Sequence, residues 1–313
     1  MKTVFTKSPF EAAAVIKSGG IVAFPTETVY GLGADLFNTA AIRRIFEAKR
    51  RPPDNPLIAH IGEIKQINRI ASVIPPNAEK FIEAFFPGPL TIVLPKLPSV
   101  PSIATAGLET IGVRMPRNDL ALSLLRSCDV PIVAPSANIS GRPSPTTWEA
   151  VYEDLNGKID CILQGGMTEI GLESTVVACT SGVPIVLRPG AVSIEQLQAI
   201  IPETRVYTGA NVEVPRSPGL KHRHYSPNAK VVLINSKLQF SNFGLKAFIG
   251  LLRPDAGFDL VKICDSADDY AHSLFAFFRE CDSRKINSIY CQEVEEMGIG
   301  IALMDRLRRA ARG

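Results

Sequence analysis

Residues 20–35 of the chain read GIVAFPTETVYGLGAD, and this stretch indicates the fold class. Its first five residues are apolar and are followed by a proline, so they predict a buried strand. The polar segment 25–33 comes next, at the position where α/β proteins place ligand loops. Gly31 and Gly33 form half of a dinucleotide fingerprint, but Leu36 replaces its third glycine. As a cofactor motif the segment is weak, and ordinary turns also explain the glycines.

A pattern of short β-rich runs and amphipathic helices continues to about residue 200. Several predicted strands follow one another without an intervening helix, which indicates a mixed sheet rather than a purely parallel one. We therefore predict an α/β fold whose first domain, residues 1–202, has a large, mixed and twisted sheet covered by helices. Strands are expected near residues 20–24, 57–61, 90–94, 111–115, 132–134, 174–178 and 185–187, and helices after Ser8, Asn38 and Ser193 and near 77–86, 119–128 and 147–154.

The pattern changes after the first domain. Residues 203–229 show little periodicity and contain the segment SPGLKHRHYSP, which we interpret as an ordered linker. Its cations and aromatic ring, set between prolines, are unlike a flexible Gly/Ser spacer, so we expect it to fold over the site as a lid. A new βα pattern then predicts a smaller, Rossmann-like α/β domain over residues 230–313. Strands are expected near 231–234, 246–252 and 286–291, and helices near 267–280 and at the C-terminus.

Composition narrows the class of protein. Hydrophobic residues make up 46% of the 313, enough for a packed core, and the formal net charge of +3 is too small for an obligate nucleic-acid binder. No stretch approaches the roughly 20 apolar residues of a membrane-spanning helix, and no targeting segment is apparent, so we expect a cytoplasmic protein without membrane contact. The six cysteines are never closer than ten residues apart, which excludes CxxC zinc knuckles and predicts free, buried thiols.

Cations are densest in the segment EAKRRPPDNP, residues 47–56. One interpretation is a solvated helix end, because cations at a helix C-terminus complement its dipole. The other is a phosphate site, since the prolines stiffen the turn and arginine binds phosphate through two parallel hydrogen bonds. Lys49 and Arg51 end a helix whose apolar face is elsewhere, so we expect neither side chain to contribute to packing.

Further polar residues accompany the later predicted strands. Residues 134–144 carry small hydroxyl and amide side chains that either build turns or cradle phosphate oxygens. Glu173 and Arg188 flank the next two strands and either pair with each other or face one cleft. Arg114 lies inside an apolar strand, where a charge is rare unless it is paired or binds an anion.

Seven segments occur along the chain in this order: FPTETVYGLGAD, AKRRPPDNPLIAHI, FFPGPLTIVL, GVRMPRN, APSANISGRPSPT, GLESTVV and LRPGA. Together they resemble the YrdC-like L-threonylcarbamoyladenylate synthases over residues 5–200. The linker and the small second domain resemble the two-domain form of that family. Leu220 and His222 depart from the family's linker, where methionine and tyrosine are usual, so the detailed linker contacts stay open.

The resemblance implies a nucleotidyltransferase that condenses L-threonine, bicarbonate and ATP to threonylcarbamoyl-AMP and pyrophosphate. The adenylate would pass to a tRNA threonylcarbamoyl transferase complex that modifies the adenosine next to the anticodon, with at most a weak contact between this chain and tRNA. Mg²⁺ would arrive with ATP, and no metal site of the protein's own is implied. Positioning and electrostatic stabilisation would carry the catalysis, because charge develops on phosphate oxygens.

The same resemblance assigns roles to individual positions. Lys49 and Arg51 correspond to catalytic residues, and Arg114 would bind the threonine carboxylate. The threonine pocket is expected to comprise Thr28, His60, Arg114, Ala134 and Ser174. The ATP site is expected to comprise Arg51, Asn55, Thr110, Ser136, Asn138, Ser144, Arg188, His224 and Tyr225.

Two other functions stay open from the sequence. An RNA-binding module without chemistry would explain the basic cluster at residues 43–51, which has five cations and one anion and hence a charge of +4. Such a module would bind RNA with strong salt dependence and would not turn over ATP. A related carbamoyltransferase, such as the hydrogenase-maturation enzymes that contain a similar domain, would carry cysteine-rich zinc modules, whereas this chain has no CxxC pair.

Overall fold

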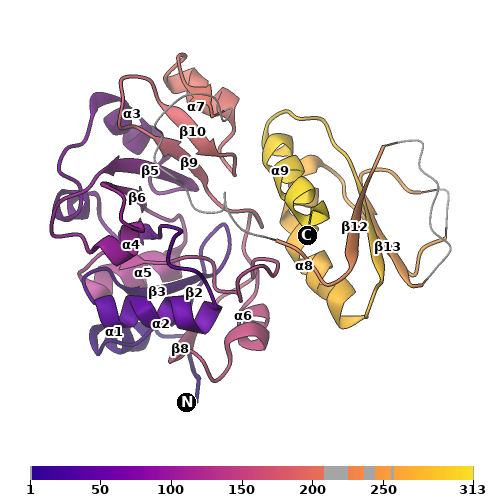
Figure 1. Ribbon diagram of the computed structural model, residues 1–313, viewed down its shortest axis with the longest axis horizontal. Coiled ribbons are helices and arrows are strands. Elements are labelled where there is room, and N and C mark those ends of the chain that lie inside the picture. Colours follow the sequence, from indigo (N-terminus) through magenta and orange to yellow (C-terminus); the bar gives the residue numbers. More distant parts are fainter. Residues whose placement is uncertain (1, 208–224, 236–243, 255–256, 313) are drawn as a thin grey trace.

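The computed structural model describes residues 2–207, 225–235, 244–254 and 257–312, which form two domains lying next to each other (Figure 1). The first domain extends through strand β11 (Arg205–Val206), and the second starts at β12 (Lys230–Ile234). Most of the predicted linker and lid falls in residues 208–224, which lie outside the described part of the chain.

One mixed sheet organises the first domain. In the described residues it has eleven strands in the order β1-β8-β2-β3-β7-β4-β6-β5-β9-β10-β11. Both parallel and antiparallel neighbours occur, so the predicted mixed sheet is confirmed. Its remaining strands are β1 (Val4–Thr6), β2 (Val22–Phe24), β3 (Gly31–Asp35), β4 (Ile58–His60), β5 (Leu90–Pro95), β6 (Thr110–Arg114), β7 (Ile132–Val133), β8 (Cys161–Leu163), β9 (Thr175–Ala178) and β10 (Ile185–Arg188).

Five helices of the first domain begin at a residue whose side chain caps them. Ser8, Asn38, Asn118, Thr147 and Ser193 each accept a hydrogen bond from the backbone N–H three residues later, which satisfies one of the unpaired donors of the first turn. The helices of this domain are α1 (Pro9–Lys17), α2 (Thr39–Lys49), the 3₁₀ helix η1 (Ile64–Arg69), α3 (Pro76–Phe85), α4 (Ser102–Thr105), α5 (Asp119–Cys128), α6 (Trp148–Leu155) and α7 (Ile194–Ile200).

The continuous apolar run that contains β2 is buried on both faces of the sheet. Val22 and Phe24 pack in a cluster with residues of α1 and α5, whereas Ile21 and Ala23 pack with residues of α2 and α6. Side chains alternate between the two faces of a strand, so only a strand covered on both sides needs apolar residues at every position.

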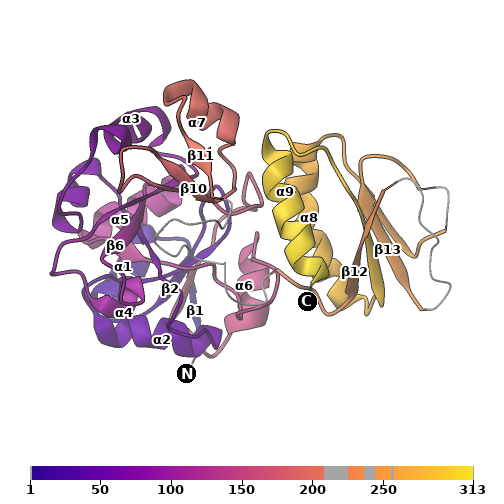
Figure 2. The ribbon, with the colours of Figure 1, turned by 45° about the horizontal axis from the view of Figure 1, so that its top comes forward.

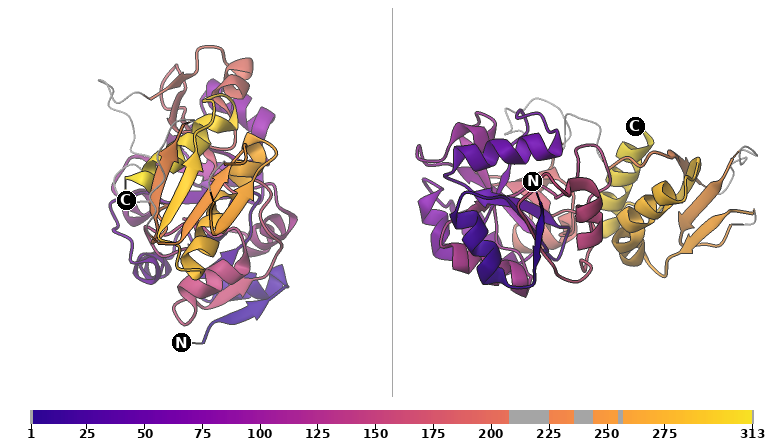
Figure 3. Two further views of the ribbon diagram at one scale, coloured as in Figure 1. Left: turned by 90° about the vertical axis from the view of Figure 1, so that its right-hand side faces the viewer. Right: turned by 90° about the horizontal axis from the view of Figure 1, so that it is seen from below.

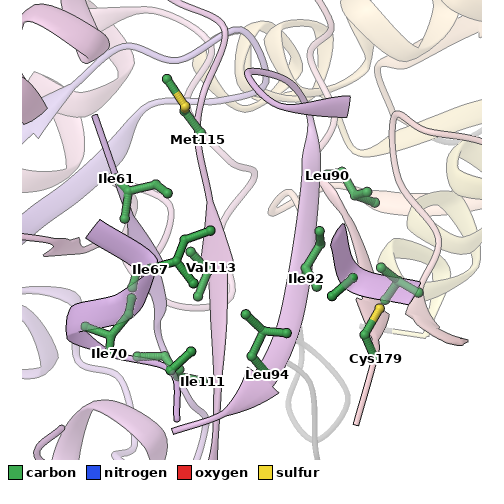
Figure 4. Packing of buried hydrophobic residues seen from close by; sticks show 14 of the residues in the cluster. Ile61, Ile67, Ile70, Leu90, Ile92, Leu94, Ile111, Val113, Met115 and Cys179 are labelled. Carbon is green, nitrogen blue, oxygen red and sulfur yellow. The ribbon is translucent and has the colours of Figure 1, made fainter. Parts of the chain in front are cut away.

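A third cluster of buried apolar residues includes side chains of β5 and β6. Ile92 of β5 and Val113 of β6 pack there with Ile67 of η1 and with Ile70 just after it (Figure 4). All six cysteines of the chain are buried and unpaired, as expected for free thiols.

The structure corrects the sequence analysis at the end of the 25–33 segment, which was expected to be a loop throughout. Gly31–Asp35 form β3, which pairs antiparallel with β2. A Cβ on Gly33 would come within 2.7 Å of Ile132 and 2.9 Å of the Phe24 ring, so the glycine permits close packing rather than a turn. Strands β1, β8, β11 and β14 were not expected either, since each has only two to four residues.

The second domain is a parallel α/β unit. Its four described strands, β12, β13 (Lys246–Gly250), β14 (Leu260–Ile263) and β15 (Ser288–Gln292), pair in the order β12-β15-β13-β14. Helices α8 (Ala267–Ser283) and α9 (Ile299–Ala311) lie between this sheet and the first domain (Figures 2 and 3). None of the helices in the described part of the chain is long and apolar enough to cross a bilayer.

A buried ion pair joins α8 to the first domain. The guanidinium of Arg279 lies 3.0 Å from the Asp154 carboxylate and donates to the carbonyl of Pro143 at 2.6 Å. Asp154 also pairs with Arg142 and accepts from the backbone N–H of Ile139 at 3.1 Å. A single carboxylate of α6 therefore ties the second domain to the polar segment 134–144.

We expect Asp154→Ala to destabilise the protein by about 3–5 kcal/mol, because it leaves Arg279 buried without its close carboxylate partner. The control is Glu153→Ala, since Glu153 is 62% exposed and only 3.8 Å from the same arginine; it should change stability by about 0.5 kcal/mol or less. Urea unfolding of both variants measures the difference. Equal losses would contradict a buried pair at the domain interface.

Candidate active site

One cavity opens where strands β4, β6 and β10 of the first domain end. The empty space between its walls, part of which is open solvent, is about 710 Å³. The lining residues are Thr26, Thr28, Val29, Gly31, Arg51, Pro56, Leu57, Ile58, His60, Arg114, Ala134, Pro135, Ser136, Asn138, Arg142, Ser144, Glu173, Ser174, Arg188 and Tyr225.

Strand register brings His60 and Arg114 together. They are the last residues of β4 and β6, and they pair directly across these parallel strands. The carboxyl ends of adjacent parallel strands meet at one edge of a sheet, which is where α/β proteins place ligands. Ala134 follows β7, and its N–H donates to the carbonyl of Ile58 at 2.9 Å, so it joins the same edge.

Arg114 is held by a carboxylate that sequence analysis missed. Its guanidinium lies 2.8 Å from Glu27, a distance that makes an ion pair although the angle is not that of a hydrogen bond. Arg114 also donates to the carbonyl of Gly88 at 3.3 Å. Glu27 is fully buried. The sequence feature that could have identified it is its position as the lone carboxylate in the loop after β2. The charge expected in the strand is therefore paired, and it still faces the cavity.

His60 is a neutral residue at this end of the cavity. Burial, together with the nearby charge of Arg114, lowers the pKa of His60 to about 3. Its Nδ1 lies 3.1 Å from the carbonyl of Ile58, which can only accept, so Nδ1 carries the proton. The ring meets Phe24 edge-on at 5.9 Å between centroids. His60 can therefore hydrogen-bond a ligand without adding charge.

Backbone hydrogen bonds join the polar segment 134–144 to the segment after β2. Leu32 donates to the carbonyl of Pro135 at 2.8 Å, and Ala137 donates to that of Tyr30 at 2.8 Å. Within the segment, the hydroxyl of Ser136 donates to Asn138 at 2.6 Å. Backbone pairing thus places these side chains on the cavity wall.

Lys49 does not line the cavity, and the expectation that it stays out of packing is wrong. Its side chain is 1% exposed, and its ammonium donates to the carbonyls of Ser136 and Asn138. Burial, with a further contribution from Arg51, lowers the pKa of Lys49 well below its ordinary value. Lys49 holds the backbone of the polar segment from behind.

Arg51 lines the cavity, as the phosphate interpretation requires. It donates to the backbone carbonyls of Asn55 and Pro56 at 3.1 and 3.4 Å, and burial lowers its pKa to about 10. Asn55 lies behind this wall. Both polar atoms of its buried amide lack a hydrogen-bond partner among the described residues.

Arg188 also lines the cavity. It is the last residue of β10, and it donates to the backbone carbonyl and the hydroxyl of Ser174 at 2.8 and 3.1 Å. Ser174 is also 2.8 Å from the hydroxyl of Thr91. Glu173 does not pair with Arg188, which decides between the two sequence-based alternatives: both residues face one cleft.

Glu173 is linked instead to the second domain. It lies 2.8 Å from Arg306 of α9, and it accepts a hydrogen bond from Ser144 at 2.6 Å. Burial alone would raise the pKa of Glu173, but the charges of Arg306 and Arg188 and the Ser144 hydrogen bond together lower it. Glu173 is therefore a carboxylate inside an otherwise cationic cavity.

Both domains are similar in sequence to known proteins. Residues 14–190 match the Sua5/YciO/YrdC family, described as telomere recombination, and residues 192–312 match the C-terminal domain of threonylcarbamoyl-AMP synthase. The threonylcarbamoyl-AMP synthase of Pyrococcus abyssi is 44% identical over 316 residues, which cover 96% of this chain and 93% of the relative. The chain belongs to the threonylcarbamoyl-AMP synthase family. It is accordingly an enzyme of the transferase class.

Other members and structures agree with this family. The threonylcarbamoyl-AMP synthase of Bacillus subtilis is 41% identical over 97% of this chain and 92% of its own. A crystal structure of P. abyssi Sua5 complexed with L-threonine has a TM-score of 0.92 at 42% identity and covers 99% of this chain and 97% of that one. E. coli YciO, at 22% identity and a TM-score of 0.55, shares the fold over 63% of this chain.

The residues implied by the synthase resemblance divide into four groups. Those that line the cavity are Thr28, Arg51, His60, Arg114, Ala134, Ser136, Asn138, Ser144, Ser174, Arg188 and Tyr225. Lys49 and Asn55 lie behind its wall, and Thr110 lies in a smaller adjoining pocket that shares Pro56, Leu57 and Ile58 with the cavity. His224 lies outside the described residues.

Arg306 contacts Glu173 at the cavity wall, and the sequence analysis missed it. The signal lay in helical spacing: Arg306 is three residues after Leu303 and four before Ala310, both on the buried stripe of α9. Arg308 and Arg309 of the same helix do not share that stripe.

The pKa of His60 predicts a pH effect on stability. The folded-state pKa is below the ordinary value of 6.5, so the unfolded chain binds a proton that the folded chain excludes, and stability falls as pH drops from 6.5 toward 3. Between pH 7 and pH 5, wild type should lose about 2 kcal/mol more than His60→Gln in urea unfolding. Parallel pH profiles for the two proteins would contradict a buried, neutral His60.

Proposed function

We propose that this chain condenses L-threonine, bicarbonate and ATP to threonylcarbamoyl-AMP and pyrophosphate. The observation that carries the proposal is the charge balance of the cavity. Of the four arginines that line it, Arg114 and Arg142 have carboxylate partners, whereas Arg51 and Arg188 have only backbone and hydroxyl oxygens within the described residues. Arginines on a cavity wall that make no ion pair with a carboxylate favour an anionic ligand such as a triphosphate.

Threonine is proposed to occupy the end near His60. There Arg114 offers a guanidinium for a carboxylate, while Thr28 and Ser174 offer hydroxyls for a polar side chain. Because His60 is neutral, it does not repel an ammonium or amine at this end. The relative crystallised with L-threonine has the same fold over nearly its whole length, which supports threonine as the amino acid.

The chemistry proposed needs no nucleophilic side chain. The threonine amine adds to bicarbonate with loss of water to give a carbamate. A carbamate oxygen then attacks the α-phosphorus of ATP, the bond to the β-phosphate oxygen breaks, and pyrophosphate leaves. Negative charge grows on the phosphate oxygens during this step, so Arg51 and Arg188 would stabilise it through charged hydrogen bonds. Ser136, Asn138, Ser144 and Tyr225 would position the nucleotide.

Mg²⁺ is proposed to reach the site bound to the phosphates of ATP. No group of three His, Cys, Asp or Glu side chains in the described residues is arranged to hold a metal ion. Mg²⁺ keeps several waters and is often bound through substrate phosphates, so phosphate oxygens and water would complete its coordination. Its role there would be to neutralise phosphate charge.

The product is proposed to pass to a tRNA threonylcarbamoyl transferase complex in the cytoplasm, with only a weak contact between this chain and tRNA. The basic cluster does not favour the RNA-binding alternative. Lys49 is buried, Arg51 lines the cavity, and Arg44 pairs with Asp160 at 2.7 Å, so Arg43 and Arg50 are its exposed members.

We expect pyrophosphate release to require threonine and bicarbonate together, because only the carbamate can attack the α-phosphate. Mixing the protein with ATP, Mg²⁺, threonine and bicarbonate should yield threonylcarbamoyl-AMP by mass spectrometry. Orthophosphate as the main product, or a rate that ignores bicarbonate, would contradict the proposal.

Two variants, one in helix α2 and one just after it, serve as a matched pair in this experiment. Arg51→Ala should lower the rate by about 10- to 100-fold, since it removes a charged hydrogen bond to phosphate. Arg43→Ala removes an exposed cation of the same cluster and should retain the wild-type rate. Equal rates in the two variants would indicate that the cluster is a solvated helix end.

A further inference from the structure

The second domain reaches the cavity through one fully buried arginine. Arg306 of α9 is 0% exposed, although most arginines in proteins keep contact with water. It donates from Nε to Glu173 at 2.8 Å, and its terminal nitrogens bond Asp305 at 2.6 Å and the carbonyl of Pro189 at 3.0 Å. Each of its three nitrogens therefore has a partner, and two of these partners belong to the first domain.

Arg306 also lies over the ring of Tyr225. The guanidinium carbon is 5.1 Å from the ring centroid, within the range of a cation–π contact. Tyr225 stacks on Phe275 of α8 at 5.5 Å between centroids, so α8 and α9 hold the ring between them. Because Tyr225 lines the cavity, the second domain fixes part of its wall.

The ion pair between Arg306 and Glu173 affects how the cavity can bind an anionic ligand. A buried carboxylate on the cavity wall repels phosphate unless a cation balances it. Arg306 is the carboxylate's salt-bridge partner at 2.8 Å, and the other Glu173 oxygen accepts from Ser144, which also lines the cavity. Asp305, the other carboxylate on Arg306, does not depend on it in the same way, because Asp305 also pairs with Arg309 at 2.9 Å.

We propose that Arg306 is a positioning residue for nucleotide binding: it neutralises Glu173 and fixes Ser144 and Tyr225 on the cavity wall. This inference rests on the proposed function, and it assigns the second domain a part in forming the ATP site. Arg306 itself does not line the cavity, so it acts through these three residues and not on the substrate.

The test measures ATP and threonine binding by calorimetry in the full-length chain. Arg306→Met should weaken ATP binding by about tenfold or more, since it removes the ion-pair partner of Glu173, while threonine affinity should change by less than about threefold. Arg306→Lys, which keeps the charge but loses the forked geometry, should fall between Arg306→Met and wild type. Arg309→Ala, which removes the other arginine on Asp305, should bind ATP as wild type does.

A double variant separates charge balance from general damage. Adding Glu173→Gln to Arg306→Met removes the unbalanced carboxylate and should recover at least about a third of the lost ATP affinity. Unchanged ATP binding in Arg306→Met, or equal loss of ATP and threonine binding in both Arg306 variants, would overturn the inference. Wild-type turnover is measured separately: an absence of threonine-dependent pyrophosphate would reject the proposed function while the ATP-binding comparison still decides the role of Arg306.

Discussion

Burying several arginines around one cavity is the constraint on which the rest of this structure depends. A guanidinium removed from water needs a counter-charge or a full set of hydrogen bonds. Arg114 is balanced by Glu27, Arg142 and Arg279 by Asp154, and Arg306 by Glu173. Among these arginines, Arg51 and Arg188 alone make no ion pair with a carboxylate within the described residues, so they mark where a bound anion would complete the balance.

The two domains depend on each other through the same balance. Asp154 and Glu173 belong to the first domain, yet each needs an arginine from the second, and both stand next to the polar segment that carries Ser136, Asn138 and Ser144. Separating the domains would leave two carboxylates without these arginines, beside the proposed phosphate site. The second domain thus contributes arginines that hold the residues around the cavity in place.

Much of the fold and of the cavity lining could be predicted from sequence because the signals are local. Apolar runs, side-chain caps and the position of polar loops after strands depend on residues a few positions apart. The burial of Lys49 and the roles of Arg279 and Arg306 could not be predicted in this way. Lys49 bonds carbonyls 87 and 89 residues away, and Arg306 meets Glu173 across 133 residues. Only the helical spacing of Arg306 hinted at its burial.

The most direct test of the central claim is a crystal structure of the protein with threonine and a non-hydrolysable ATP analogue. The account predicts phosphate oxygens within hydrogen-bonding distance of Arg51 and Arg188 and the threonine carboxylate on Arg114, with the Glu173–Arg306 pair intact. Phosphates bound away from both Arg51 and Arg188, for instance at the strand ends of the second domain, would contradict it.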